Sequence, residues 1–161
     1  MVTIKDVAAY VLQKTGRITT MKLQKLVYYS QAWHVTWTDK KLFNEQFQAW
    51  ANGPVAPALF DAHRGQYMIS GMPEGDPTAL NSSQRATVDA IVRDYGSLSG
   101  AALSALTHSE PPWLDARGHL PSAASSSTPI TTKAMKRYYG SLDDSNAESV
   151  ADLTWPTSIN W

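Results

Sequence analysis

The run ITTMKLQKLVYYSQAWHVTW, residues 18–37, constrains the fold more than any other segment. Its apolar residues recur every three or four positions, which predicts one long amphipathic helix with Thr20 as its cap. The predicted buried face consists of Leu23, Leu26, Val27, Ser30, Trp33 and Trp37. Lys22 and Lys25 fall off this face. Together with Lys14 and Arg17 they form either a local basic patch or an ordinary solvated helix surface.

Capping and turn residues divide the rest of the chain into shorter helices. Thr3 and Asp6 have the spacing of a capping box, and Gly16 ends the helix that they begin. Pro57 suits the first position of another helix. Further helices are expected over residues 57–63, 81–96, 99–106 and 130–140, with a short one after residue 145.

The pattern changes to short extended segments near residues 42–43 and 47–51. The turn Asn52-Gly53-Pro54 follows, because glycine tolerates a positive φ and proline fixes its own φ. Residues 111–129 read as a loop that ends in the low-complexity stretch SAASSSTP. The expected fold is therefore mainly α, a compact single domain over residues 1–161. It has a small β element near residues 42–55 and a short polar, aromatic C-terminal tail.

Composition excludes several classes of function. The 14 basic and 14 acidic side chains cancel, which makes nucleic acid and anionic lipid unfavourable partners. The absence of cysteine excludes disulfides, zinc–thiolate sites and thiol catalysis. No apolar run reaches the length of a membrane helix, and the N-terminus lacks a signal-peptide pattern, so a cytoplasmic protein is expected. Six Trp and seven Tyr indicate either an aromatic core or an aromatic interface.

The stretch LTHSEPPW, residues 106–113, has the residue types of an active site. A structural interpretation explains more of it. His108 can bond the carbonyl groups freed at a helix end, Pro111 and Pro112 prevent the helix from continuing, and Trp113 anchors the chain on the core. Glu110 and Asp115 could pair as acid and base, but their proline-rich context favours a polar surface loop.

No other catalytic or metal-binding motif is present. The four histidines are dispersed, without the spacing of a metal site, and neither a serine-nucleophile elbow nor a phosphate-binding loop occurs. We therefore expect no enzyme activity, no metal and no cofactor. The residues expected to have structural roles are Trp33, Trp50, Gly53, Pro54, His108, Pro112 and Trp113.

Three segments in this order resemble the Panacea domain of the SocA-like antitoxin family: MKLQKLVYYSQAWHV, LFNEQFQAWANGPVAPALFD and YGSLSGAALSALTHSEPPWLDAR. The matching spacing extends over roughly residues 4–140. The sequence departs from the family pattern at Asn52, where an aromatic or bulky residue is expected before Gly-Pro-Val, and in the loop SAASSSTP.

The resemblance implies an antitoxin of a bacterial or phage toxin–antitoxin pair, with a mainly helical fold. It implies a cognate toxin as the partner and direct binding as the mechanism. Delivery of the toxin to a cytosolic protease, or enzymatic reversal of the toxin's modification, are the alternatives. No catalytic residues are carried over. The contact surface is expected to combine residues 47–57 with residues 111–129, and its exposed candidates are Asn52, Leu114, Arg117 and His119.

Overall fold

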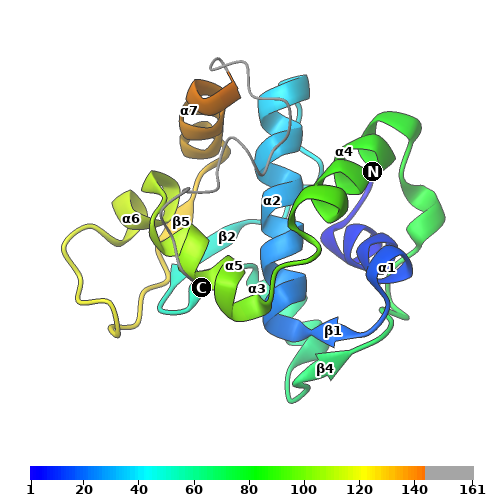
Figure 1. The fold of residues 1–161 in the computed structure, drawn as a ribbon, viewed down its shortest axis with the longest axis horizontal. Helices are drawn as coiled ribbons and strands as arrows, with labels where there is room; N and C mark the ends of the chain where they lie inside the picture. The colour runs from blue at the N-terminus through cyan, green and yellow to red at the C-terminus, as the bar shows by residue number, and fades with distance from the viewer. Residues whose placement is uncertain (144–161) are drawn as a thin grey trace.

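The computed structural model describes residues 1–143, and its helices are arranged around one central helix, α2 (Thr20–Thr38) (Figure 1). The helices that pack most extensively against α2 are α1 (Ile4–Thr15), α4 (Ser82–Tyr95), α5 (Gly100–His108) and α7 (Thr132–Asp143). The prediction of a mainly α fold with a small β element is confirmed. Within the described residues no helix is both long and apolar enough to cross a membrane.

Helix α2 is buried on all sides, not on one face as predicted. Every residue from Leu23 to Val35 is buried, which includes Lys25. Trp33 is fully buried, but Trp37 remains 39% exposed, with its ring centroid 5.2 Å from that of Trp33. The assignment of Trp37 to the core is therefore wrong, as is the assignment of Lys25 to a solvated surface.

Two glutamine side chains of α2 take the place of strand partners for nearby backbone segments. Gln24 accepts a hydrogen bond from the Ala56 N–H at 3.0 Å and donates one to the Ala56 carbonyl at 3.3 Å. Gln31 does the same for the segment at residues 42–43, with bonds of 2.7 Å from Leu42 N and to Phe43 O. Buried backbone groups need such partners, so the two amides fix how both segments lie against the helix.

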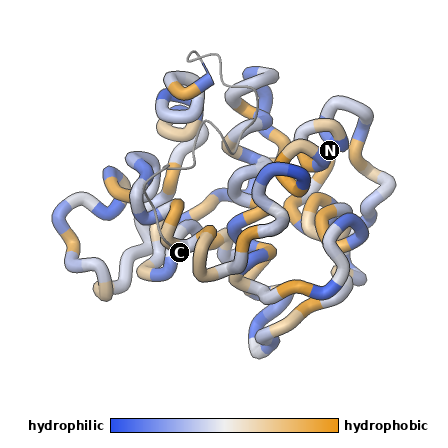
Figure 2. The backbone as a smooth tube through the Cα atoms, viewed as in Figure 1, coloured by the Kyte–Doolittle hydropathy of each residue, from blue (hydrophilic) through white to orange (hydrophobic). Residues whose placement is uncertain are grey.

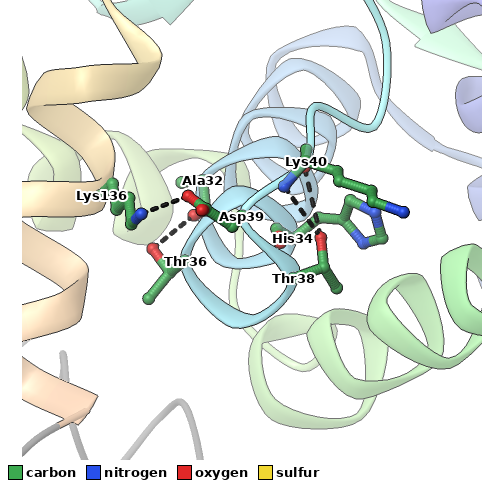
Figure 3. Close-up of polar contacts among 7 residues, drawn as sticks. All are labelled: Ala32, His34, Thr36, Thr38, Asp39, Lys40 and Lys136. Carbon is green, nitrogen blue, oxygen red and sulfur yellow. Dashed lines mark hydrogen bonds and ion pairs between the residues drawn. The ribbon is translucent and has the colours of Figure 1, made fainter.

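Side-chain hydrogen bonds and an ion pair stabilise the C-terminal end of α2 (Figure 3). The hydroxyls of Thr36 and Thr38 donate to backbone carbonyls four residues earlier in the helix, each at 2.8 Å. Asp39 ends the helix in the left-handed conformation, with φ at 62°. Its carboxylate pairs with Lys136, which ties this end of α2 to α7.

The shorter helices mostly begin where their caps predict. The Thr3–Asp6 capping box is present, Ser99 caps α5, and α3 (Pro57–His63) begins with its proline. Asn81 forms a second capping box at the start of α4.

Three helix boundaries differ from the expectation. The N-cap of α2 is Thr19, not Thr20. Pro111 and Pro112 open a helix of their own, α6 (Pro111–Arg117), so the prediction of a loop from residue 111 is wrong there. A proline in the first turn of a helix loses no hydrogen bond, which explains why two prolines can begin α6. Helix α7 passes through Gly140 to Asp143 instead of ending at the glycine. The helix expected after Ser145 lies outside the described residues.

The β structure is limited to two small antiparallel sheets. One has the order β3 (Gly53–Val55), β2 (Phe47–Trp50), β5 (Pro129–Ile130), and the other pairs β1 (Ile18–Thr19) with β4 (Met68–Ile69). The predicted extended segment at residues 42–43 is buried but forms no strand. A short 3₁₀ turn, η1 (Pro77–Ala79), lies beside α1. Strand β5 brings the end of the long loop next to the hairpin β2–β3.

The core between α2, α4 and α7 is rich in aromatic rings. Tyr29 stacks on Tyr95 with centroids 4.3 Å apart, and Tyr28 meets Phe47 edge-on at 5.3 Å. Hydrophobic and hydrophilic residues alternate along the backbone (Figure 2). Much of the aromatic content is therefore used in the core.

Gly53 is required by two separate constraints. Its φ is +108°, which side chains other than glycine rarely adopt, and an added Cβ would lie 2.8 Å from Lys25 Cε and 2.9 Å from Thr107 Oγ1. Replacement of Gly53 by alanine therefore combines backbone strain with a steric clash.

We predict that Gly53→Ala lowers the free energy of unfolding by about 3 kcal/mol, measured by urea denaturation. Gly65→Ala is the matched control, because Gly65 also has a positive φ of 82° but no atom within 4 Å of the added Cβ. Its loss should be near 1 kcal/mol. Equal losses in the two variants would show that the contact with Lys25 imposes no constraint.

Candidate functional site

A cavity of about 700 Å³ opens between the first half of α2, the hairpin β2–β3, helix α3 and the loop Ser125–Ser127. Its apolar walls include Met21, Val55, Trp50 and Phe60. The rings of Trp50 and Phe60 meet edge-on, with centroids 5.1 Å apart. This volume and this mixture of aromatic walls with a few polar groups are typical of ligand-binding pockets.

The tautomer of His63 in this cavity is determined by Gln24. Gln24 Oε1 accepts from Ala56 N, so Nε2 is the donor of that amide, and it lies 3.0 Å from His63 Nε2. His63 Nε2 must therefore accept, which leaves the imidazole neutral with its proton on Nδ1. Burial lowers the pKa of His63, and the nearby Lys25 lowers it further.

Lys25 is the most unusual side chain of the cavity. It is 1% exposed, and its Nζ donates to the Pro54 carbonyl at 3.0 Å. Desolvation lowers the pKa of Lys25 from 10.5 to about 7, because the ammonium loses its water without gaining a carboxylate. At neutral pH the side chain therefore exchanges between the charged and the neutral form.

The hairpin that carries Trp50 and Asn52 is held from behind by α5 and α6. Trp113 Nε1 donates to the Trp50 carbonyl at 2.8 Å, and Ser104 Oγ donates to the Asn52 carbonyl at 2.6 Å. Trp113 is buried, as expected, while Trp50 is half-buried at the cavity. Gly53 and Pro54 are both buried in β3.

Arg117 does not lie on the exposed surface where a contact residue was expected. It is 5% exposed, and its guanidinium lies over the Trp113 ring, 4.9 Å from the centroid. It donates to the Ala49 carbonyl at 2.9 Å. It also donates to three loop carbonyls, those of Pro121, Ser122 and Ala124, at 2.7–3.3 Å. Arg117 thus positions the loop whose next residues, Ser125–Ser127, line the cavity.

The other contact candidates are exposed. Asn52 lines the cavity, and Leu114 and His119 lie on α6 and just after it. The structure brings together the two segments expected to form the contact surface, since β2 pairs with β5 in register Phe47–Ile130. Whether these residues contact a partner remains a prediction.

His108 lies at the end of α5, as expected, but it does not bond the freed carbonyl. The hydroxyl of Ser109 donates to the Leu106 carbonyl instead, at 2.7 Å. The His108 ring stacks on Trp113 with centroids 4.1 Å apart, and its Nε2 is buried without a partner in the described residues. Burial lowers the pKa of His108, with Lys25 and Arg117 acting in the same direction.

Glu110 is buried, so its assignment to a polar surface loop is wrong. Its Oε1 accepts hydrogen bonds from Tyr29 at 2.7 Å and Tyr139 at 2.8 Å, whereas Oε2 has no partner in the described residues. Burial raises the pKa of Glu110 to about 8, although the two hydroxyls oppose the shift. Glu110 is a neutral acid at pH 7 and joins α2 to α7. Asp115 is exposed on α6, so the structure shows no acid–base pair with Glu110.

Gln24 and Lys25 were missed by sequence reasoning as parts of a site. Helical periodicity places them off the apolar face, and both partners, Ala56 and Pro54, lie about thirty residues further along the chain. Among residues 1–143, no group of three or more His, Asp or Glu side chains could hold a metal ion.

The raised pKa of Glu110 gives a pH-dependent prediction. The folded pKa exceeds the unfolded value of 4.5, so this contribution to stability is complete below pH 4.5 and is lost as pH rises through 8. Relative to Glu110→Gln, the unfolding free energy of the wild type should fall by about 4 kcal/mol between about pH 5 and pH 9. Chemical denaturation of both proteins at each pH measures the difference; a constant difference would contradict the burial of an ionisable Glu110.

Lys25 should show the opposite dependence. Its folded pKa of about 7 lies below the unfolded 10.5, so its contribution is complete above pH 10.5 and is lost as pH falls through 7. Relative to Lys25→Met, the wild type should gain about 4 kcal/mol between about pH 6 and pH 10.5. Lys14→Met is the control, because it makes the same change at an exposed lysine. A Lys25 difference that does not change with pH would mean that its ammonium is solvated.

Comparison with known proteins assigns the chain to a family. The family description "Antitoxin SocA-like, Panacea domain" matches residues 23–114, more than half of the chain. This range includes most of α2, the hairpin, α3, α4, α5 and the first half of α6. No curated protein and no solved structure matches the chain. The resemblance found in the sequence is thereby confirmed, and the chain belongs to the SocA-like antitoxin family defined by the Panacea domain.

Proposed function

We propose that this protein is the antitoxin of a bacterial or phage toxin–antitoxin pair and neutralises its cognate toxin in the cytoplasm by direct, stable binding. The observation that carries the proposal is its membership of the SocA-like antitoxin family. An antitoxin implies a toxin partner, and binding is the mechanism for which the surface offers a suitable face. We further propose that the chain acts without enzymatic turnover.

The face that we assign to the toxin surrounds the cavity. Met21, at its edge, is 37% exposed and Tyr67 is 79% exposed. The Tyr67 carbonyl accepts from Thr20 N at 2.9 Å, which places this tyrosine next to a residue that lines the cavity. Exposed tyrosine and methionine side chains are enriched in protein interfaces, where they bury large apolar areas.

The same face includes two candidates from the sequence. Asn52 lines the cavity, and the loop held by Arg117 borders it at Ser125–Ser127. Loops fixed on a rigid scaffold commonly carry recognition. A stable interface buries about 1,600 Å² in total, so we expect contacts to extend from Tyr67 across the cavity to the loop, and on to Leu114 and His119.

The formal net charge of zero suits a contact that depends on shape and apolar area. Without a global field, association should depend weakly on ionic strength, unlike the binding of a nucleic acid. Salt dependence is therefore a further property that separates protein binding from nucleic-acid binding.

We predict that the protein and the toxin encoded beside it form a complex that co-elutes in size-exclusion chromatography, with full neutralisation only near one equivalent. Neutralisation far below one equivalent without a complex would instead indicate an enzyme. Loss of the toxin protein from cells that contain the antitoxin would indicate delivery to a protease.

Tyr67→Ala should weaken toxin binding about thirtyfold or more while the protein remains folded, as expected for an interfacial hot spot. Lys133→Ala is the matched control, because Lys133 is exposed on α7 and lies outside the cavity. Calorimetry with purified toxin measures both variants. Equal affinities for Tyr67→Ala, Lys133→Ala and wild type would remove this face from the interface.

A further inference from the structure

The cavity is lined by one buried lysine, Lys25, whose hydrogen-bond donors an apolar partner could not satisfy. Lys25 Nζ carries up to three hydrogens, and in the described residues the Pro54 carbonyl is its acceptor. At least one donor therefore remains without an acceptor in a nearly water-free position. The side chain lies among the groups that line the cavity.

The cavity contains no negative charge to balance this lysine. None of its described lining residues is an aspartate or a glutamate. His63 is kept neutral because Nε2 accepts from Gln24, so protonation there would set two donors against each other. Lys25 is thus the basic centre of the cavity, and an anion placed there would meet no acidic side chain among these lining residues.

The walls define the rest of the ligand. Trp50, Phe60, Met21 and Val55 offer aromatic and aliphatic contact area in a volume of about 700 Å³. A small inorganic anion would leave these apolar side chains in contact with water. A flat apolar group would cover them, and the burial of apolar surface would stabilise the complex. The ligand should therefore be apolar with a single anionic group.

We propose that this cavity binds an aromatic or similarly apolar group that carries one carboxylate, with the carboxylate accepting hydrogen bonds from Lys25 and the apolar part lying against Trp50 and Phe60. The carboxylate comes either from a free small molecule or from an acidic or C-terminal residue of a bound toxin. The first source goes beyond neutralisation; the second rests on the proposed toxin binding.

Such a ligand changes the protonation of Lys25. Desolvation holds the pKa of Lys25 at about 7, so part of the population is neutral slightly above pH 7. A carboxylate favours the ammonium form and raises that pKa. Binding should therefore draw a fraction of a proton from the buffer, and an uncharged analogue should draw none.

The test uses indole-3-acetate and its neutral counterpart indole-3-acetamide as probes of the purified protein. Calorimetric titration near pH 7.5, in two buffers that differ in ionisation enthalpy, reports affinity and proton uptake together. We expect the acid to bind about tenfold more tightly than the amide, as charge-assisted hydrogen bonds are stronger than neutral ones. Only the acid should show an enthalpy that depends on the buffer.

The variant Lys25→Met should remove both the preference for the acid and the proton uptake, while binding of the amide remains. Lys14→Met, at an exposed lysine outside the cavity, should behave as wild type. If Lys25→Met does not fold, the comparison of acid and amide binding to the wild type still tests the proposal. Equal affinities for acid and amide, no binding of either at millimolar concentration, or an acid preference that survives in Lys25→Met would each overturn the proposal.

A last arm identifies the source of the carboxylate. If indole-3-acetate competes with the toxin and fails to bind the preformed complex, the toxin occupies the cavity with its own carboxylate. If it binds the complex as it binds the free protein, the cavity takes a free small molecule. Because the probe is measured on the protein alone, failure to form a toxin complex leaves the cavity test intact.

Discussion

The structure depends on hydrogen bonds between side chains of α2 and the backbone of segments that have few strand partners. The Gln31 amide hydrogen-bonds the N–H of Leu42 and the carbonyl of Phe43. The Gln24 amide hydrogen-bonds the N–H and the carbonyl of Ala56. An unpaired buried amide costs about as much as a lost hydrogen bond, so these contacts fix where each segment lies. Helix α2 thus forms the centre of the core and also supplies hydrogen bonds to the backbone of the irregular segments around it.

The same arrangement accounts for two of the buried ionisable groups, Lys25 and Glu110. Lys25, the residue after Gln24, donates to Pro54, and Glu110 accepts from Tyr29 of the same helix. Each group lacks a charged partner, so burial moves each pKa toward the neutral form. Their effects on stability have opposite dependence on pH, so the two contributions partly cancel between pH 7 and 8.

Local signals in the sequence were sufficient for most of the caps, the Asn52-Gly53-Pro54 turn and the mainly helical class, because each depends on a few adjacent residues. The cap of α2 is an exception, displaced by one residue to Thr19. Helical periodicity did not predict burial correctly where a polar residue is buried or an apolar residue is exposed. Lys25, Glu110 and Arg117 are polar residues that periodicity or context places on the surface. Each is instead buried and forms a hydrogen bond with a backbone carbonyl or a hydroxyl group distant in the sequence. Trp37 failed in the reverse sense, because it belongs to the predicted apolar face and yet is 39% exposed near the end of α2. The cavity itself was not predictable, because its walls come from four separate segments.

Arg117 holds the serine-rich loop entirely through main-chain oxygens. A carbonyl is the same in every residue, so the anchor imposes almost no demand on the side chains it holds. The side chains of Pro121, Ser122 and Ala124 are therefore not fixed by this anchor, which holds the loop whose next residues, Ser125–Ser127, line the cavity. If the toxin binds at this face, as proposed, point mutations in the rim can change what it recognises while the helices that support it stay as they are. A scaffold of this kind can follow a rapidly diverging partner at little risk to its own folding.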